Sequence, residues 1–204
     1  WGVSSCAYQH EGGYNGEGQP QNNWAAWERS GKVARSGRSV DFWNRYEEDF
    51  DRAEMIGLTG FRLGVDWTRI QPEGSSGALQ EDAVNRYADM ICALRARHLE
   101  PLITLCHFTT PHWLGTDPWL DERTPHLLAA FQKKLWLLLN RKLTERGVAP
   151  PTWFITMNEP NMLAACTYNV GAFPSGRRVW WSAALCALQT MLERFHATKD
   201  FAMS

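Results

Sequence analysis

The sequence predicts an α/β protein with a parallel sheet, and a (β/α)8 barrel of the TIM type is the favoured architecture. Short apolar runs alternate with amphipathic helical segments, and this alternation, repeating every ~40–50 residues, is typical of parallel sheets. Polar residues stand at or just after the carboxyl ends of the predicted strands, at Gln9, Asp66, His107, Asn158 and Glu159. In a barrel, all of these positions lie on the catalytic face.

An open, doubly wound sheet is the alternative architecture for the same alternation of strands and helices. The first strand-to-helix turn lacks a Gly-x-Gly-x-x-Gly sequence and the chain has no P-loop, so nucleotide-binding open sheets are disfavoured. The chain has 204 residues, whereas a complete barrel typically needs ~250. We therefore expect residues 1–204 to form the N-terminal half of a single catalytic barrel, supplying about the first four βα units.

Four segments have the composition of strands, and they are 1–8, 61–67, 101–108 and 153–158. The third is a nearly continuous apolar run, which is typical of a strand buried on both faces. The fourth follows the breaker pair Pro150-Pro151 and is expected to begin as a buried strand. Pro160 ends it, because proline cannot donate a ladder hydrogen bond.

Four helices are predicted from apolar stripes with helical spacing, at 40–56, 82–97, 124–146 and 180–199. Thr124 and Pro125 are expected to be the N-cap and the first residue of the third helix. The inward face of that helix is expected to carry Leu127, Leu128, Phe131, Leu135, Leu138 and Leu139.

The composition excludes several classes of partner. Lys and Arg total 21 against 22 Asp and Glu, so the chain has no basic field for nucleic acid and no polybasic face for a membrane. It has no apolar stretch of about 18 residues and no visible signal peptide. Eleven tryptophans favour carbohydrate weakly, since flat aromatic faces suit sugar rings, although core packing explains most of them.

The cysteines and histidines predict neither a disulfide framework nor a metal site. Five cysteines form no Cys-x-x-Cys motif, and an odd number without a framework indicates free thiols in a reducing compartment, hence a cytoplasmic protein. Six histidines show no metal-ligand spacing. We expect no metal and no cofactor.

Asn158 and Glu159 are the first candidates for chemistry. They place an amide and a carboxylic acid where a strand must stop, beside apolar and aromatic residues. A carboxyl group in that position can act as a general acid. For Glu159 alone, an ordinary surface carboxylate in a loop is the simpler interpretation.

Nine motifs, one of which contains Asn158 and Glu159, occur in an order that resembles the N-terminal half of glycoside hydrolase family 1, the retaining β-glucosidases and β-galactosidases. They are Trp1-Gly-Val-Ser-Ser-Cys-Ala-Tyr-Gln-His-Glu-Gly12, Asn23-Trp24, Trp27-Glu28, Phe42-Trp-Asn-Arg-Tyr-Glu-Glu-Asp49, Gly60-Phe-Arg-Leu-Gly-Val-Asp-Trp-Thr-Arg-Ile70, Pro101-Leu-Ile-Thr-Leu-Cys-His-Phe-Thr-Thr-Pro111, Trp153-Phe-Ile-Thr-Met-Asn-Glu-Pro160, Gly171-Ala-Phe-Pro-Ser-Gly176 and His196-Ala197.

The resemblance implies a (β/α)8 barrel and hydrolysis by double displacement. Glu159 resembles the acid/base, which protonates the leaving oxygen and then takes a proton from water. Asn158 resembles the residue that binds the sugar 2-hydroxyl, and Gln9 and His107 resemble the ligands of the other glycone hydroxyls. Arg62 resembles the arginine beside the nucleophile, where a cation keeps a carboxylate ionised.

Each of these residues also has a structural explanation. Gln9 could cap a loop, and His107 could be a satisfied core histidine. Arg62 lies in an apolar strand, so a nearby carboxylate is expected in either case. Trp113 and Met162 are candidates for the aglycone side. Three further acids are expected to be structural or solvated, and they are Glu11, Asp66 and Glu73.

The chain departs from the family in two respects. It lacks the Glu-Asn-Gly motif that carries the nucleophile in the second half of family members, and it lacks the late Trp and Glu that bind the glycone. A retaining enzyme needs two carboxyl groups ~5–5.5 Å apart, so the 204 residues alone are expected to be inactive. Phe108 stands where the family commonly has Trp, which could alter stacking on the glycone.

Two functions therefore remain open. The first is the acid/base-bearing part of a retaining β-glycosidase whose partners are a β-linked glycoside and a C-terminal half-barrel, covalent or as a separate chain. The second is a non-catalytic, glycosidase-like carbohydrate-binding or half-barrel assembly protein. A homo-oligomer is possible in either case. A nucleotide-binding doubly wound domain lacks any supporting Gly-rich loop.

Overall fold

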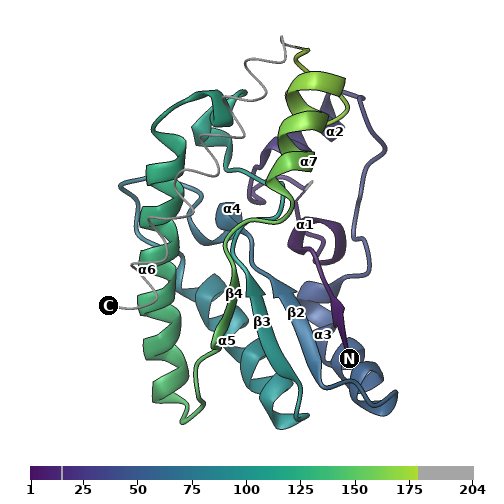
Figure 1. Cartoon of the computed structure of the whole chain (residues 1–204), viewed down its shortest axis with the longest axis vertical. Helices are drawn as coiled ribbons and strands as arrows, with labels where there is room; N and C mark the ends of the chain where they lie inside the picture. The colour runs from purple at the N-terminus through teal and green to yellow at the C-terminus, as the bar shows by residue number, and fades with distance from the viewer. Residues whose placement is uncertain (15, 179–204) are drawn as a thin grey trace.

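The computed structural model describes residues 1–14 and 16–178, and in it four parallel strands form one sheet in the order β1-β2-β3-β4 (Figure 1). The register pairs Gly2 with Gly60, Gly60 with Glu100, and Leu102 with Trp153. The strand order follows the chain without the reversal that marks a doubly wound sheet. The strands are β1 (Gly2–Ser4), β2 (Gly60–Gly64), β3 (Glu100–Thr104) and β4 (Trp153–Ile155).

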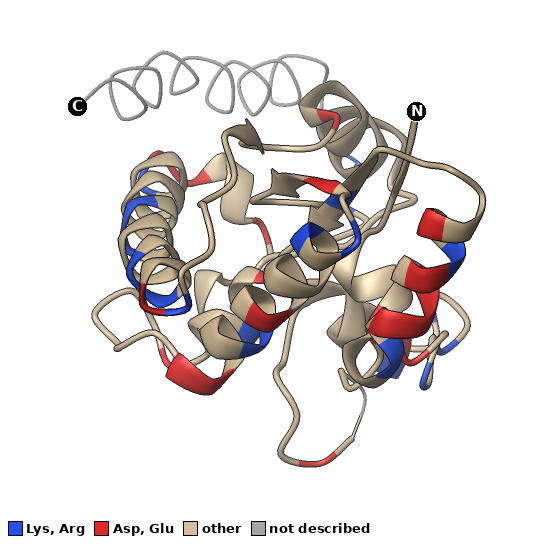
Figure 2. Cartoon of the chain, turned by 90° about the horizontal axis from the view of Figure 1, so that it is seen from below, with Lys and Arg blue, Asp and Glu red and all other residues tan. Residues whose placement is uncertain are grey.

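Three long helices, α3 (Phe42–Met55), α5 (Glu81–Ala96) and α6 (Thr124–Glu145), pack on one face of this sheet (Figure 2). The shorter elements are α1 (Ala7–His10), α2 (Asn23–Arg29), α4 (Trp67–Ile70), α7 (Pro160–Ala164), the 3-10 helices η1 (His112–Leu114) and η2 (Pro118–Leu120), and the π-helix η3 (Ala165–Val170). A parallel sheet wound on one side is the geometry of a barrel wall, so the predicted fold class is confirmed.

The core lies between the sheet and the helices because alternate strand residues point to opposite faces. Phe61 and Leu63 of β2 are buried against the helices, whereas Gly60 and Arg62 on the other face are only partly buried. The rings of Phe50 and Phe61 meet edge to face with centroids 4.9 Å apart. Such aromatic pairs add stability beyond the apolar area that they bury.

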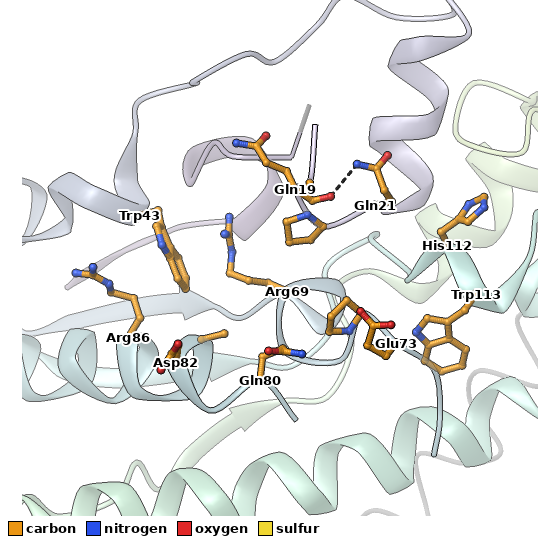
Figure 3. A pocket seen from close by; sticks show the side chains of 14 residues that line it. Gln19, Gln21, Trp43, Arg69, Glu73, Gln80, Asp82, Arg86, His112 and Trp113 are labelled. Carbon is orange, nitrogen blue, oxygen red and sulfur yellow. Dashed lines mark hydrogen bonds between the residues drawn. The ribbon is translucent and has the colours of Figure 1, made fainter. Parts of the chain in front are cut away.

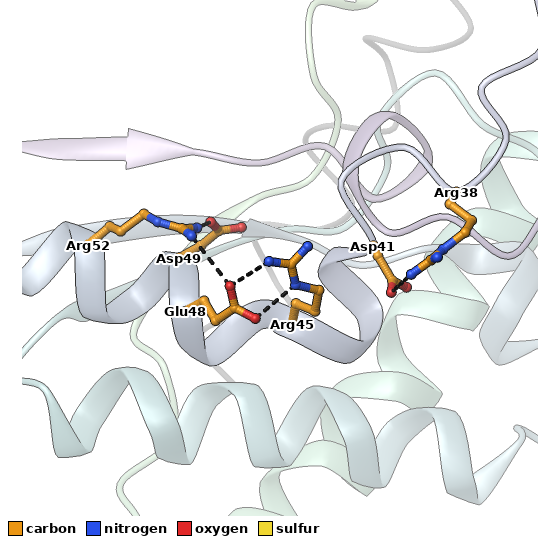
Figure 4. A network of polar contacts seen from close by, with 6 residues as sticks. All are labelled: Arg38, Asp41, Arg45, Glu48, Asp49 and Arg52. Atoms are coloured by element: carbon orange, nitrogen blue, oxygen red, sulfur yellow. Dashed lines mark hydrogen bonds and ion pairs between the residues drawn. The ribbon is translucent and has the colours of Figure 1, made fainter.

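The outer surface of α3 carries an ionic network (Figure 4). Its members pair at helical spacing or just before the helix, and they are Arg38 with Asp41, Arg45 with Glu48, and Arg52 with Asp49 and Glu48. Arg97, the C-cap residue of α5, also pairs with Glu47 and Asp51 of α3, which connects the two helices. Exposed pairs of this kind contribute little to stability.

The predicted strands extend too far at their carboxyl ends. The run 1–8 contains a strand only at Gly2–Ser4, and Ala7–His10 is helical. In 61–67 the strand stops at Gly64, because the Asp66 side chain accepts the backbone N–H of Arg69 and caps α4. The run 101–108 likewise leaves the sheet after Thr104.

Three other expectations need correction or cannot be compared. The fourth strand is not buried, since Trp153 is 63% exposed at the outer edge of the sheet. Thr124 is the first residue of α6 rather than its cap, which is Arg123. The helix predicted at 180–199 lies outside the described residues. Within residues 1–14 and 16–178, no helix has the length and apolar character needed to cross a membrane.

Candidate active site

Arg62 connects three neighbouring strands at the carboxyl edge of the sheet. From β2 its Nε donates to Oγ1 of Thr104 at the end of β3, at 2.6 Å, and its Nη2 donates to Oδ1 of Asn158 after β4, also at 2.6 Å. The backbone N–H of Asn158 donates to the carbonyl of Cys106 at 2.9 Å. Asn158 is therefore held through both its backbone and its side chain, and it is buried.

The carboxylate expected beside Arg62 is not found among the described residues. Among the described residues, the guanidinium donates to a hydroxyl and to an amide oxygen, both neutral. Because Arg62 is only partly buried, solvent and neutral acceptors suffice to satisfy its guanidinium in this part of the chain, and a carboxylate beside it stays a prediction.

Glu159 has an uncommon backbone conformation for its residue type. Its φ of 43° and ψ of 61° lie in the left-handed region, and it precedes Pro160, the first residue of α7. A residue before proline normally adopts extended backbone, and residues in sparsely populated conformations concentrate at functional sites. The carboxyl group is exposed and makes no capping bond to α7. The strained backbone therefore places an exposed carboxyl group, which does not cap α7, directly after Asn158.

Gln9 and His107 line one cavity of about 350 Å³. Burial, with positive charge from Arg62 and His10, lowers the pKa of His107 to about 4. The imidazole is therefore neutral at pH 7 and offers one donor and one acceptor. Its Nδ1 is buried and has no hydrogen-bond partner among the described residues. The cavity thus combines an amide and a neutral imidazole with aromatic walls from Tyr8, Trp24 and Phe108.

Asn23 fixes the loop that carries His107, a role that its motif alone did not predict. Its Nδ2 donates to the carbonyl of Phe108 at 3.1 Å, and its Oδ1 accepts the N–H of Thr110 at 2.9 Å. Phe108 has a φ of 66°, so this turn is held in a conformation that non-glycine residues rarely adopt. The Asn23-Trp24 pair was a family motif, but only the structure shows its partner.

The three acids expected to be structural or solvated are either buried or exposed. Glu11 is buried and accepts hydrogen bonds from Tyr14 at 2.6 Å, Tyr87 at 2.8 Å and Arg69 at 3.0 Å. Burial raises the pKa of Glu11, and Arg69 opposes that rise. Asp66 is also buried, and its pKa is likewise raised by burial. The Glu73 side chain is exposed.

Trp113 lies at a different cavity, of about 620 Å³, between the loop 18–21 and the start of α5 (Figure 3). Its Nε1 donates to the carbonyl of Gln71 at 2.9 Å, and its ring meets Trp67 edge to face. This cavity shares no lining residue with the one that contains Gln9 and His107. Met162 is 45% exposed on α7. The structure does not bring Trp113 into the cavity of Gln9 and His107, and the aglycone roles of both residues stay predictions.

The described residues contain no group of three or more His, Cys, Asp or Glu side chains placed to hold a metal ion. The four cysteines in this part of the chain, Cys6, Cys92, Cys106 and Cys166, are free thiols. Burial raises the pKa of Cys6 and of Cys106 to about 12, which makes both thiols poor nucleophiles.

A one-sided parallel sheet with polar side chains gathered at its carboxyl edge is part of a (β/α)8 barrel. The sequence profile of glycosyl hydrolase family 1 matches residues 1–201, and the chain belongs to that family.

The chain is similar to known family members in both sequence and structure. The chain is 32% identical over 183 residues to beta-glucosidase 17 of Arabidopsis thaliana, covering 87% of this chain and 34% of that protein. It is 28% identical to the human cytosolic beta-glucosidase, covering 86% of this chain and 37% of the relative. The family 1 β-glucosidase of Thermotoga maritima superimposes with a TM-score of 0.84 at 25% identity, over 99% of this chain and 44% of that one. The chain spans about a third of the length of the curated relatives.

Proposed function

We propose that this chain is the acid/base-bearing part of a retaining β-glycosidase that hydrolyses β-glucosides or related β-glycosides. Glu159 is the acid/base, and the nucleophile comes from a C-terminal half-barrel. The observation that carries the proposal is the arrangement at the carboxyl edge, where Arg62 holds Asn158 at 2.6 Å immediately before Glu159. A residue that binds the substrate beside the acid would strengthen its bond as the glycosidic bond breaks.

Two features of the sheet support a missing half-barrel. β1 and β4 are each paired on one side only within the described sheet. The sheet face opposite the helices lines a hollow of about 670 Å³ with Arg62, Leu102 and Trp153. Open strand edges and exposed apolar faces are normally covered. A second set of strands, in the same chain or in another, would close both edges and fill this hollow.

The 204 residues alone are proposed to be inactive. Double displacement needs a second carboxylate ~5–5.5 Å from the first, and the family motif that supplies it does not occur in this sequence. The free thiols further favour the cytoplasm as the compartment.

The test compares the full-length protein with its Glu159→Gln variant on two aryl β-glucosides. With a phenol that needs protonation to leave, kcat/KM should fall by ~10²–10⁴-fold. With a phenol that leaves without protonation, formation of the glycosyl-enzyme should be far less affected. Glu54→Gln, an exposed glutamate on α3, is the matched control and should keep full activity.

Equal losses on both substrates would contradict the assignment of Glu159 as the acid. Sugar binding without turnover by the unmutated protein would instead establish the non-catalytic alternative.

A further inference from the structure

Thr104 is a buried polar residue at the end of β3, and its hydroxyl contacts the guanidinium of Arg62. Its side chain is 0% exposed, and its Oγ1 accepts the Nε–H of Arg62 at 2.6 Å. In the strand register Arg62 pairs with Leu102, and Gly64 pairs with Thr104. Arg62 and Thr104 are therefore diagonal neighbours on the sheet face away from the helices. Because Gly64 has no side chain, the long arginine can extend along this face to Thr104.

Arg62 donates both of its side-chain hydrogen bonds from one edge of its guanidinium. The Nε–H and one Nη2–H lie on the same edge of this planar, rigid group. The first donates to Thr104 and the second to Oδ1 of Asn158, each at 2.6 Å. A planar group that is held at both ends of one edge cannot turn without breaking a hydrogen bond. The Thr104 hydroxyl thus fixes the plane of the guanidinium.

The fixed guanidinium decides which atoms Asn158 offers to a ligand. A guanidinium only donates, so the amide oxygen must face it and the amide nitrogen must face away. This Nδ2 makes no hydrogen bond to another described residue, yet it is not among the enclosed side-chain atoms. Linked hydrogen bonds polarise one another, so the bond from the cation makes the amide a stronger donor. Asn158 therefore directs a fixed N–H donor into the open space at the carboxyl edge, directly before Glu159.

We propose that Thr104 is a positioning residue for the glycosidase reaction: its hydroxyl fixes Arg62, which aims the Asn158 amide at a hydroxyl group of the sugar. The inference rests on the proposed function, in which Asn158 binds the sugar beside the acid Glu159. The resemblance assigns the sugar 2-hydroxyl to Asn158, so the effect of Thr104 should be confined to substrates that carry this hydroxyl. A substrate contact that is misplaced by ~1 Å can cost ~10²-fold in rate.

The test compares kcat/KM of the full-length protein on an aryl β-glucoside and on its 2-deoxy analogue. Thr104→Val keeps the branched shape of the side chain but removes the acceptor, whereas Thr104→Ser keeps the acceptor. On the glucoside, Thr104→Val should lower kcat/KM by ~10–100-fold and Thr104→Ser by less than ~3-fold. On the 2-deoxy analogue, the contact is already missing, so both variants should match the wild type within ~3-fold.

Thr167→Val is the matched control. Thr167 is also buried, at 2% exposed, but its hydroxyl has no partner among the described residues. This variant should keep the kcat/KM of the wild type on both substrates. If Thr104→Val does not fold, Thr104→Cys replaces it, because a thiol is about as small as the serine hydroxyl but is only a weak acceptor. The comparison is then between Thr104→Cys and Thr104→Ser.

A loss that is specific to the glucoside and restored by serine supports the inference. Equal losses on both substrates overturn it, because a purely structural role, or an effect on the nucleophile, does not depend on the 2-hydroxyl. Unchanged activity of Thr104→Val on the glucoside overturns it too, and so does a serine variant that is no better than valine. These three results leave the glycosidase proposal intact. A wild type that cleaves neither substrate refutes the proposed function, and the inference fails with it.

Discussion

Acid should destabilise this protein through His107. In the folded chain its pKa is lowered from 6.5 to about 4, chiefly by burial and then by the charges of Arg62 and His10. Between these two values the unfolded chain binds more protons than the folded one, so stability falls as pH falls. The contribution is fully present above pH 6.5 and is lost progressively toward pH 4.

The size of the effect follows from the two pKa values. Moving from about pH 7.5 to about pH 5 costs about 2 kcal/mol by proton linkage alone. Because the imidazole is partly exposed, solvent screening reduces this to about 1–1.5 kcal/mol. His107→Asn removes the titrating group and should remove this part of the pH dependence.

The assay is urea unfolding of the full-length protein at both pH values. His98→Asn is the matched control, since His98 is exposed and its φ of 57° suits asparagine. Wild type and His98→Asn should each lose about 1–1.5 kcal/mol more than His107→Asn on acidification. Parallel losses in all three proteins would refute the argument. An NMR titration of the His107 ring gives its pKa independently.

Two further predictions concern the buried groups. Glu11→Gln leaves the Arg69 guanidinium without its charge partner, and the Arg69 side chain is only 10% exposed. This substitution should lower the free energy of unfolding by about 3–5 kcal/mol. The control Glu54→Gln should lower it by less than ~0.5 kcal/mol. An effect below ~1 kcal/mol would show that the Glu11 pair is dispensable. Trp67→Ala removes an indole that is 1% exposed and stacked on Phe131 at 5.1 Å, and urea midpoints should report a loss of about 3–5 kcal/mol; Trp67→Phe should lose less, and equal losses would contradict the packing explanation.

The helices were predictable because their signal is local. The stripe predicted at 40–56 became α3 at Phe42–Met55, and that at 82–97 became α5 at Glu81–Ala96. Each apolar stripe packs against a single surface, so its apolar residues recur with the 3.6-residue period of a helix. Boundaries of this kind depend on residues within one or two turns of each other.

The strand ends were not predictable from the same kind of signal. Val65 and Trp67 are as buried as Phe61 and Leu63, so apolar residues continue past Gly64, where β2 ends. What ends β2 is the Asp66 cap and the start of α4, a polar interaction inside an apolar run. Because the loops that carry the candidate site begin there, the error falls on the residues proposed for function.

The site residues also differ in how far the sequence predicted them. Asn158 and Glu159 were selected from their place after a strand and within a motif. Asn23 also belongs to a family motif, but it was not selected as a site residue, because its significance comes from a partner far away in the chain. Phe108 is 85 residues from Asn23. Sequence spacing carries no information about such contacts until the fold is known.

The two faces of β2 explain why one arginine connects the fold to the proposed chemistry. Phe61 and Leu63 anchor the strand beneath the helices, and this leaves Arg62 on the opposite face. Burying a cation on that face costs free energy unless hydrogen-bond acceptors replace its lost hydration. Thr104 and Asn158 supply two, across β3 and beyond β4. Satisfying the guanidinium thus sets the position of the amide, and hence of the residue that follows it. The same alternation that builds the core therefore positions Glu159.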